Sequence, residues 1–329
     1  MPITLAEARK NVSDDIQAQV IDEFRKSSYL LDNITFHDCV SPIGGGGTLT
    51  YGYYRTESLS SASFRAINAE YPETSASKKK CSVDLKVFGG SFKIDRVIAN
   101  MGGVVDEVQF QMDHLIRATK ALAHDTIIHG NSADDALVFD GLDVAVTGTS
   151  TEWNAGGADG AMETIDLSST EAIDANYRKF VDKMDEWLAE LNNPSCLMMN
   201  AKMLAKVRAV ARRIGMYQAK EGEFGKTIDT YAGIPLIDLG EKAGATIPSV
   251  NSSNTVVETD ENGNSSIYAC RFGMDGFHGV TLAGGNVIKT WLPTWEKDGA
   301  VKRGEVEMIM ALALKETKSA GVFRNIKIK

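Results

Sequence analysis

The chain has 329 residues, of which 43% are hydrophobic and 24% are charged, a composition typical of a soluble globular protein. Its 44 acidic residues outnumber the 35 Lys and Arg, and the resulting net charge of −9 disfavours nucleic acid as a specific ligand. No apolar stretch approaches the roughly 20 residues that a membrane helix needs, and no signal for secretion is recognisable. The sequence therefore predicts a chain that stays in the cytosol in which it is made and has no membrane partner.

The cysteines, Cys39, Cys81, Cys196 and Cys270, lie far apart in the sequence. They form neither a CxxC motif nor a Cys/His pair at metal-binding spacing, so nothing indicates a disulfide framework or a zinc site. We expect reduced and mostly buried thiols.

The first quarter of the chain is organised around glycine and β-forming residues. An amphipathic helix is predicted from Ser13 to Leu31, and the run of glycines at 44–47 ends it. Thr48–Arg55 has the Thr and Tyr content of a strand, and the polar stretch Thr56–Ser63 follows it.

A second strand is predicted where apolar Cys81, Val83, Leu85 and Val87 alternate with polar residues. Together with the first strand it makes residues 48–98 a long two-stranded excursion. An isolated ribbon of this kind is marginally stable in water, so it needs support from its own domain or from a neighbouring subunit.

The remainder predicts a long helix and a small α/β unit. The helix runs from Val104 to His129, and Gly130 stands at its end. The later elements are predicted in this order: a helix from Ser169 to Leu191, a strand at Ser195–Met199, a helix at Lys202–Ile214, an apolar strand at Gly233–Ile237, a hairpin turning at Asn262-Gly263 between Val256-Val257 and Ile267-Tyr268, and strands at Val287–Leu292 and Val306–Leu314.

Motifs for catalysis and for cofactor binding are incomplete. The glycine run lacks the Lys-Ser or Lys-Thr of a phosphate-binding loop, and the series Asp260, Asn262, Asn264 has its glycine at the wrong place for a calcium loop. The histidines of the long helix do not share a spacing suited to a metal. We therefore predict no catalytic, cofactor-binding or metal-ligating residue, and no enzyme activity.

The order of these elements resembles the major capsid proteins of tailed phages, which have the HK-ninety-seven-type fold shared with encapsulins. The resemblance rests on short motifs in a fixed order: Ala69-Glu70-Tyr71-Pro72-Glu73 before the alternating strand, Phe139-Asp140-Gly141-Leu142 after the long helix, Ala232-Gly233-Ile234-Pro235-Leu236-Ile237, and Gly304-Glu305-Val306-Glu307 through Leu314 followed by Ser319-Ala320-Gly321-Val322-Phe323. It covers nearly the whole chain.

The resemblance implies an α+β shell subunit with four parts. These are an N-terminal arm at 1–46, an extended β loop at 47–95, a peripheral domain with the long spine helix at 96–165 and 286–329, and an axial α/β domain at 166–285. Residues 240–265 would then lie at the centre of a ring of subunits.

The implied function is that of a structural subunit. It would self-assemble into pentamers and hexamers of an icosahedral phage head, in the virion and, during assembly, in the host cytoplasm. Its partners would be further copies of itself, a scaffolding protein, a portal, and packaged double-stranded DNA contacted without sequence specificity. An encapsulin-like compartment shell and a hydrolase remain as alternatives.

We expect the subunit interface to use the extended loop and the axial tip. Lys78, Lys79 and Lys80 would form the basic tip of the loop and meet carboxylates of a neighbouring subunit. The apolar face of the alternating strand would be covered only by that neighbour. The expected interface residues are Phe24, Tyr51, Arg55, Lys78, Lys79, Lys80, Val83, Leu85, Val87, Glu258 and Asp260.

Overall fold

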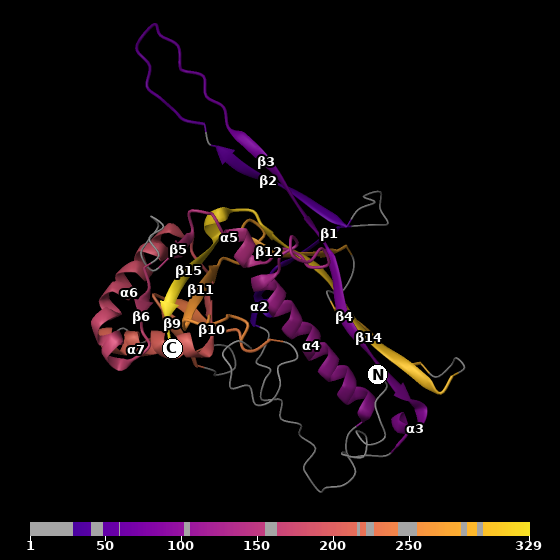
Figure 1. The fold of residues 1–329 in the computed structure, drawn as a ribbon. Coiled ribbons are helices and arrows are strands. Elements are labelled where there is room, and N and C mark those ends of the chain that lie inside the picture. The colour runs from indigo at the N-terminus through magenta and orange to yellow at the C-terminus, as the bar shows by residue number, and fades with distance from the viewer. Residues whose placement is uncertain are drawn as a thin grey trace.

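The structure is a computed structural model that describes residues 29–40, 49–58, 60–101, 106–154, 163–215, 218–221, 227–242, 255–283, 288–294 and 299–329. Its strands form a five-stranded sheet, an eight-stranded sheet and a two-stranded ribbon, and one long helix runs beside the first of these (Figure 1). The mixed α+β class predicted from the sequence is confirmed. No helix in the described part of the chain is both long and apolar enough to cross a bilayer.

The long helix α4 (Glu107–His129) is the predicted spine. Asp106 caps its N-terminus, because the carboxylate accepts hydrogen bonds from the backbone N–H of Val108 and Gln109. Gly130 ends it as predicted, with its N–H bonded to the carbonyl of Thr126. A Cβ on Gly130 would lie 2.2 Å from the carbonyl oxygen of Phe139, so this close approach of two backbone segments requires glycine.

The five-stranded sheet lies along this helix. Its order is β1 (Phe36–Val40), β12 (Phe277–Leu282), β14 (Val301–Leu314) and β13 (Ile288–Trp291), and β4 (Lys86–Asp95) pairs with residues 301–310 of β14. The predicted apolar face of β14 is confirmed, since Val306, Met308, Met310, Leu312 and Leu314 are all buried. The short helices α2 (Tyr29–Asn33) and α3 (Arg96–Ala99) precede β1 and follow β4.

The eight-stranded sheet carries the α/β unit. Its strands are β5 (Glu152–Asn154), β15 (Ala320–Lys327), β11 (Asn264–Cys270), β7 (Cys196–Met199), β10 (Ile234–Asp238), β9 (Thr227–Tyr231) and β8 (Gln218–Glu221) in spatial order, with β6 (Ile165–Asp166) beside β15. The helices α6 (Thr170–Glu190) and α7 (Ala201–Ile214) pack on it, and α5 (Leu142–Val146) lies between it and the end of α4. A 3-10 turn at Thr317–Ser319 joins β14 to β15.

The helix boundaries of this unit follow from their caps. Ser169 accepts a hydrogen bond from the N–H of Ala172, and Asn200 accepts one from the N–H of Met203. Gly215 ends α7 at a φ of +73°, a conformation that disfavours every residue with a side chain. The predicted helices 169–191 and 202–214 are therefore confirmed.

Three strands lie in a different sheet from the one that the predicted domain boundaries imply. β5 belongs to the segment 96–165 but pairs with β15 of the eight-stranded sheet. β12 belongs to the segment 166–285 but pairs with β1 and β14 of the five-stranded sheet. β15 belongs to the segment 286–329 but pairs with β11 of the eight-stranded sheet. The chain crosses between the two sheets twice near its C-terminus, a crossing that strand patterns alone cannot reveal.

The hairpin predicted at Asn262-Gly263 is only partly right. The turn is present, with Gly263 at a φ of +85° and its N–H bonded to the carbonyl of Asp260. Val256 and Val257, however, form no strand of this hairpin, because the N–H of Val256 bonds to the carbonyl of Gly240 and β11 pairs with β15 and β7.

The two-stranded ribbon is formed by β2 (Thr50–Ser58) and β3 (Ser77–Asp84) and projects from the body of the molecule (Figure 1). Residues 60–76 extend beyond it as a long loop. The predicted excursion over 48–98 is thus a free ribbon only in its first part. β4 leaves the ribbon and pairs with β14, in a register that runs from Asp95 opposite Val301 to Lys86 opposite Met310. The helix predicted at 13–31 lies outside the described residues except for its last part, where α2 begins at Tyr29.

Candidate assembly surfaces

The base of the ribbon is fixed to the body by its inward face. Tyr53 is buried, and its ring stacks on that of Tyr51 with centroids 5.8 Å apart. The Tyr51 ring meets the edges of His37 of β1 at 5.6 Å and His278 of β12 at 6.1 Å. The ribbon therefore leaves the body at a set angle, although its outer part has no cover.

Four residues of the expected subunit interface prove to make contacts within their own chain. Leu85 is 3% exposed, and Tyr51 and Val83 pack against the same core. Arg55 donates from Nε to the carbonyl of Leu314 at 2.8 Å, and its Nη2 bonds to the same oxygen. The expectation that the apolar face of this strand lacks cover within one subunit is wrong for Val83 and Leu85.

Val87 lies on the opposite face and is 53% exposed. The phase of the alternation changes because the strand changes partner: β3 pairs with β2, β4 pairs with β14, and Leu85 lies between them with its N–H bonded to the carbonyl of Leu49. Beyond this point Phe92 and Ile94 are the buried residues. Val87 therefore remains available to a partner.

The three lysines lie on the shaft of the ribbon rather than at its tip, which corrects the prediction. Lys78, Lys79 and Lys80 pair with Thr56, Arg55 and Tyr54. Since register partners share a face, Lys80 lies opposite exposed Tyr54 on the outer face, with Lys78 next along that face, and Lys79 lies opposite Arg55 on the inner one.

The actual tip carries apolar side chains that are not among the interface residues predicted from the sequence. Phe64 is fully exposed, Ile67 is 92% exposed and Tyr71 is 64% exposed. The Arg65 guanidinium lies over the Tyr71 ring at 5.2 Å, and the N–H of Ala69 bonds to the carbonyl of Ala66 in the turn between them. Their signal in the sequence is three large apolar residues within a stretch too polar to have a core of its own.

A second group of exposed apolar residues is carried by elements at the far end of the β4–β14 pair, near α3 (Figure 1). It is formed by exposed residues of α3, of β13 and the residue after it, and of the start of β14: Val97, Trp291, Leu292 and Val301. Arg96 donates its N–H to the carbonyl of Ala300, which holds the two strand ends together. The ribbon tip and this surface lie at opposite ends of the molecule.

Glu258 and Asp260, two further residues of the expected interface, lie near the turn that precedes β11. Glu258 pairs with Lys242 at 2.5 Å, and the Asp260 carboxylate accepts the N–H of Asn264 at 2.7 Å within its turn. Both are thus engaged within the chain. Phe24 lies outside the described residues, and so do residues 243–254 of the loop that was expected at the ring centre.

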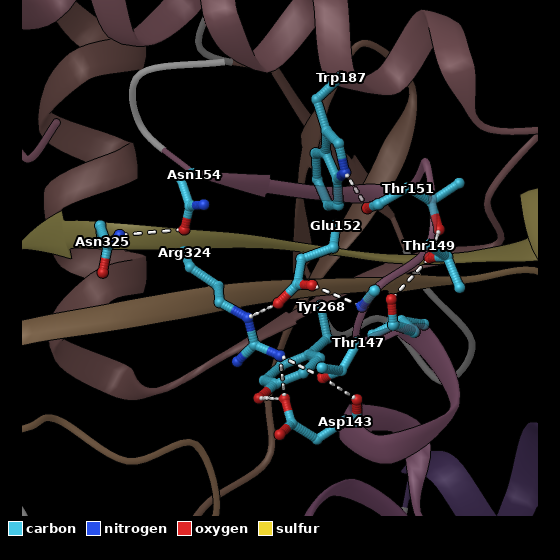
Figure 2. Close-up of polar contacts among 12 residues, drawn as sticks. Asp143, Thr147, Thr149, Thr151, Glu152, Asn154, Trp187, Tyr268, Arg324 and Asn325 are labelled. Carbon is cyan, nitrogen blue, oxygen red and sulfur yellow. Dashed lines mark hydrogen bonds and ion pairs between the residues drawn. The ribbon is translucent and has the colours of Figure 1, made fainter. Parts of the chain in front are cut away.

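A polar network joins the eight-stranded sheet to α5 (Figure 2). Arg324 of β15 pairs with Asp143 of α5 and Glu152 of β5, each at 2.7 Å. The Tyr268 hydroxyl donates to the same Asp143 carboxylate at 2.8 Å, and burial followed by the Asp143 charge raises the pKa of this phenol. The network lines a pocket of about 240 Å³ that His129 of α4 also borders.

The charged groups of this network are paired with one another within the chain. The Arg324 charge is matched by two carboxylates, and the His129 ring nitrogen is bonded to the carbonyl of Val256 at 2.7 Å. In the described part of the chain no group of three His, Cys, Asp or Glu could hold a metal ion.

Comparison with known proteins gives structural likeness alone. No family model matches the chain, and no curated protein matches it. The holo-SrpI encapsulin complex of Synechococcus elongatus PCC 7942 matches with a TM-score of 0.63 at 14% identity, over 99% of this chain and 97% of that one.

Phage proteins match as well. A structure from Microbacterium phage Oxtober96 has a TM-score of 0.59 at 10% identity over 100% of both chains, and the capsid of Myoviridae phage XM1 has 0.55 at 13% over 98% of both. The chain therefore has the HK-ninety-seven-type fold that its sequence predicted, over its full length.

Proposed function

We propose that this chain is a major capsid protein, the structural subunit that self-assembles into pentamers and hexamers of an icosahedral phage head. The observation that carries the proposal is the projecting ribbon, whose tip exposes Phe64, Ile67 and Tyr71 without cover from the described part of its own chain. A soluble monomer gains nothing from such a tip, whereas a shell subunit buries it on a neighbour. The full-length likeness to phage capsid structures supports this reading.

The partner is a second copy placed head to tail. A contact between different surfaces of two copies is heterologous, and such contacts close into rings when the rotation allows. The ribbon tip and the surface at Val97, Trp291 and Val301 lie at opposite ends of the molecule, so a contact that uses one end of each copy has this character. Each contact can be weak, because a subunit held by several neighbours gains from effective concentration.

The proposed capsid subunit has four structural parts and several partners. The segments 1–46, 47–95, 96–165 with 286–329, and 166–285 would act as arm, extended loop, peripheral domain and axial domain, with β12 and β15 exchanged between the last two. A scaffolding protein, a portal and enclosed DNA would be the partners, in the virion and earlier in the host cytoplasm. The net charge of −9 suits a wall that encloses DNA without adhering to it.

An encapsulin-like shell is the second candidate, and the TM-score of 0.63 with the SrpI complex favours it. The two candidates share the assembly and differ in content. An enzyme role such as a hydrolase has no support in the residue groups described above.

The test is electron microscopy of the purified chain in negative stain, alone and with the products of neighbouring genes. Closed shells, rings or tubes are expected. Shells isolated from the native source should hold nuclease-resistant DNA if they are phage heads and a co-purifying protein if they are compartments. A chain that stays monomeric across a wide range of concentration and salt, even with its scaffold supplied, contradicts both candidates.

A further inference from the structure

The eight-stranded sheet has a short joint at its centre. β7 and β11 pair in antiparallel fashion over three residue pairs, which end at Cys196 opposite Cys270. On one side of this joint lie β5, β15 and β11, and on the other lie β7, β10, β9 and β8. The two parts of the sheet are therefore connected by few backbone hydrogen bonds.

The two cysteines at this joint have the geometry of a disulfide that has not formed. Their Sγ atoms are 3.6 Å apart, and both residues are fully buried as free thiols. Opposed residues of antiparallel strands have Cα atoms about 4.5 or 5.5 Å apart, depending on the kind of pair. Both spacings lie within the Cα range of disulfides, about 4.4 to 6.8 Å. The sulfurs need to approach by only about 1.5 Å, which rotation of the side chains can supply.

We propose that Cys196 and Cys270 are a modification site at which a small oxidant forms an intrachain disulfide across β7 and β11. The inference does not depend on the proposed function. Cys81 provides the internal contrast, because it is half-buried on β3 opposite Tyr53 and faces no cysteine in the ladder. A thiol of that kind reacts with an alkylating reagent but has no intrachain partner there.

The reaction can be written with diamide, a small neutral azo oxidant. One thiol gives up its proton, and its sulfur adds to an azo nitrogen, forming an S–N bond. The second sulfur then attacks the first, which forms the S–S bond, breaks the S–N bond and releases the hydrazine. Two thiols are thus oxidised, and the azo group gains two electrons and two protons.

Burial controls the rate of this step. It raises the pKa of the Cys270 thiol and so keeps that group protonated at neutral pH. The reagent must also enter through a local opening of the sheet. The disulfide should therefore form slowly in the folded protein and faster at higher pH. A reducing cytosol would keep the pair as thiols, and an oxidising medium outside the cell would allow closure.

The disulfide would join residues 74 positions apart in the sequence, at the joint between the two parts of the sheet. Closing a loop of this length removes conformational freedom from the unfolded chain, and it holds β7 against β11 in the folded one. The oxidised protein should therefore unfold at a higher temperature than the reduced one. Dithiothreitol should reverse the shift.

The experiment uses the full chain, purified with reductant and then exposed to diamide at alkaline pH. The temperature is kept just below the midpoint of thermal unfolding. Free thiols are blocked, the protein is unfolded and digested, and its peptides are identified by mass. The expected product is one linked pair that contains Cys196 and Cys270, with a mass lower by two hydrogens and with Cys81 alkylated. Cys81→Ala should retain this product, and Cys196→Ala and Cys270→Ala should each lose it.

Two results would overturn the inference. One is full alkylation of Cys196 and Cys270 in the wild-type chain after oxidant treatment just below the midpoint. The other is a product in which either cysteine is linked to a different residue or to a second chain. Both are read from the wild-type protein, so the test holds even if the alanine variants fold poorly.

Discussion

Arg324 shows how a single residue can link the eight-stranded sheet to α5. Its side chain is only 23% exposed and meets carboxylates from α5 and β5. Asp143 also accepts the Tyr268 hydroxyl, and Glu152 accepts the N–H of Gly148, so loss of the guanidinium would leave both carboxylates with a hydrogen bond but without their countercharge.

We expect Arg324→Ala to lower the free energy of unfolding by roughly 2 kcal/mol, because it removes hydrogen bonds to two carboxylates at a partly buried site. The matched control is Arg303→Ala, because the Arg303–Glu305 pair is exposed and should contribute about 1 kcal/mol or less. Chemical denaturation of the unassembled subunit measures both. Equal losses of unfolding free energy would show that this network stabilises the fold no more than an exposed ion pair does.

His278 gives the subunit a pH dependence. Burial, followed by the charge of Lys315, lowers its pKa from 6.5 to about 4, and His37, Asp275 and the carbonyl of Gly276 also face it. The folded state thus favours neutral imidazole. Its contribution to stability is complete above pH 6.5, where the unfolded histidine is also neutral, and declines as the pH falls from 6.5 towards 4.

We expect His278→Phe to reduce the loss of unfolding free energy between pH 7 and pH 4, because the variant has no proton to gain there. Denaturation midpoints across this range for both proteins provide the measurement. An unchanged pH profile in the variant would assign the acid sensitivity to other groups.

At the scale of elements, most helices and strands follow from local sequence signals. The sheet memberships that were predicted wrongly have a common cause. The spine helix, α6 and α7 were predictable because their caps and apolar spacing lie within each segment. The sheet membership of β12 and β15 was not, because it depends on partners far away in the sequence.

The candidate interface shows the same limit. The alternation Val83, Leu85, Val87 reads as one face, but a change of strand partner at Leu85 reverses the face beyond it. The exposed tip at Phe64 and Ile67 could have been suspected from its composition, whereas the position of the lysines on the shaft required the strand register.

The contact between β4 and β14 depends on a glycine. A Cβ on Gly89 would lie 2.0 Å from the carbonyl oxygen of Val306, which is backbone and cannot rotate away. We expect Gly89→Ala to cost about 1 to 3 kcal/mol of unfolding free energy, as overpacking typically does. Gly52→Ala on β2 is the control, because its nearest neighbour would be the Lys80 side chain at 3.7 Å and its effect should stay within about 0.5 kcal/mol. Thermal unfolding of both variants decides the point.

At the scale of the whole molecule, the proposed assembly places the ribbon tip on a neighbouring copy. Phe64→Ser with Ile67→Ser should therefore prevent or strongly slow shell formation while the unfolding midpoint of the subunit stays unchanged, since neither side chain packs within its own chain. Phe64→Leu with Ile67→Val keeps the tip apolar and should still assemble. Light scattering and negative-stain images follow the assembly, and normal shells from the serine variant would contradict this role of the tip.

The outer face of the ribbon adds an electrostatic contact to this apolar one. Lys78 and Lys80 project from the same face as Tyr54, and the net charge of −9 favours acidic over basic surface on a neighbouring copy. We expect Lys78→Glu with Lys80→Glu to slow or block assembly at low salt and leave the subunit fold intact, because like charges would then meet. Lys79→Glu on the inner face should have a smaller effect. The difference between these variants should shrink as salt rises and the Debye length falls from about 30 Å at 0.01 M to about 8 Å at 0.15 M. Normal shells from the double variant at low salt would show that assembly does not use this face of the ribbon.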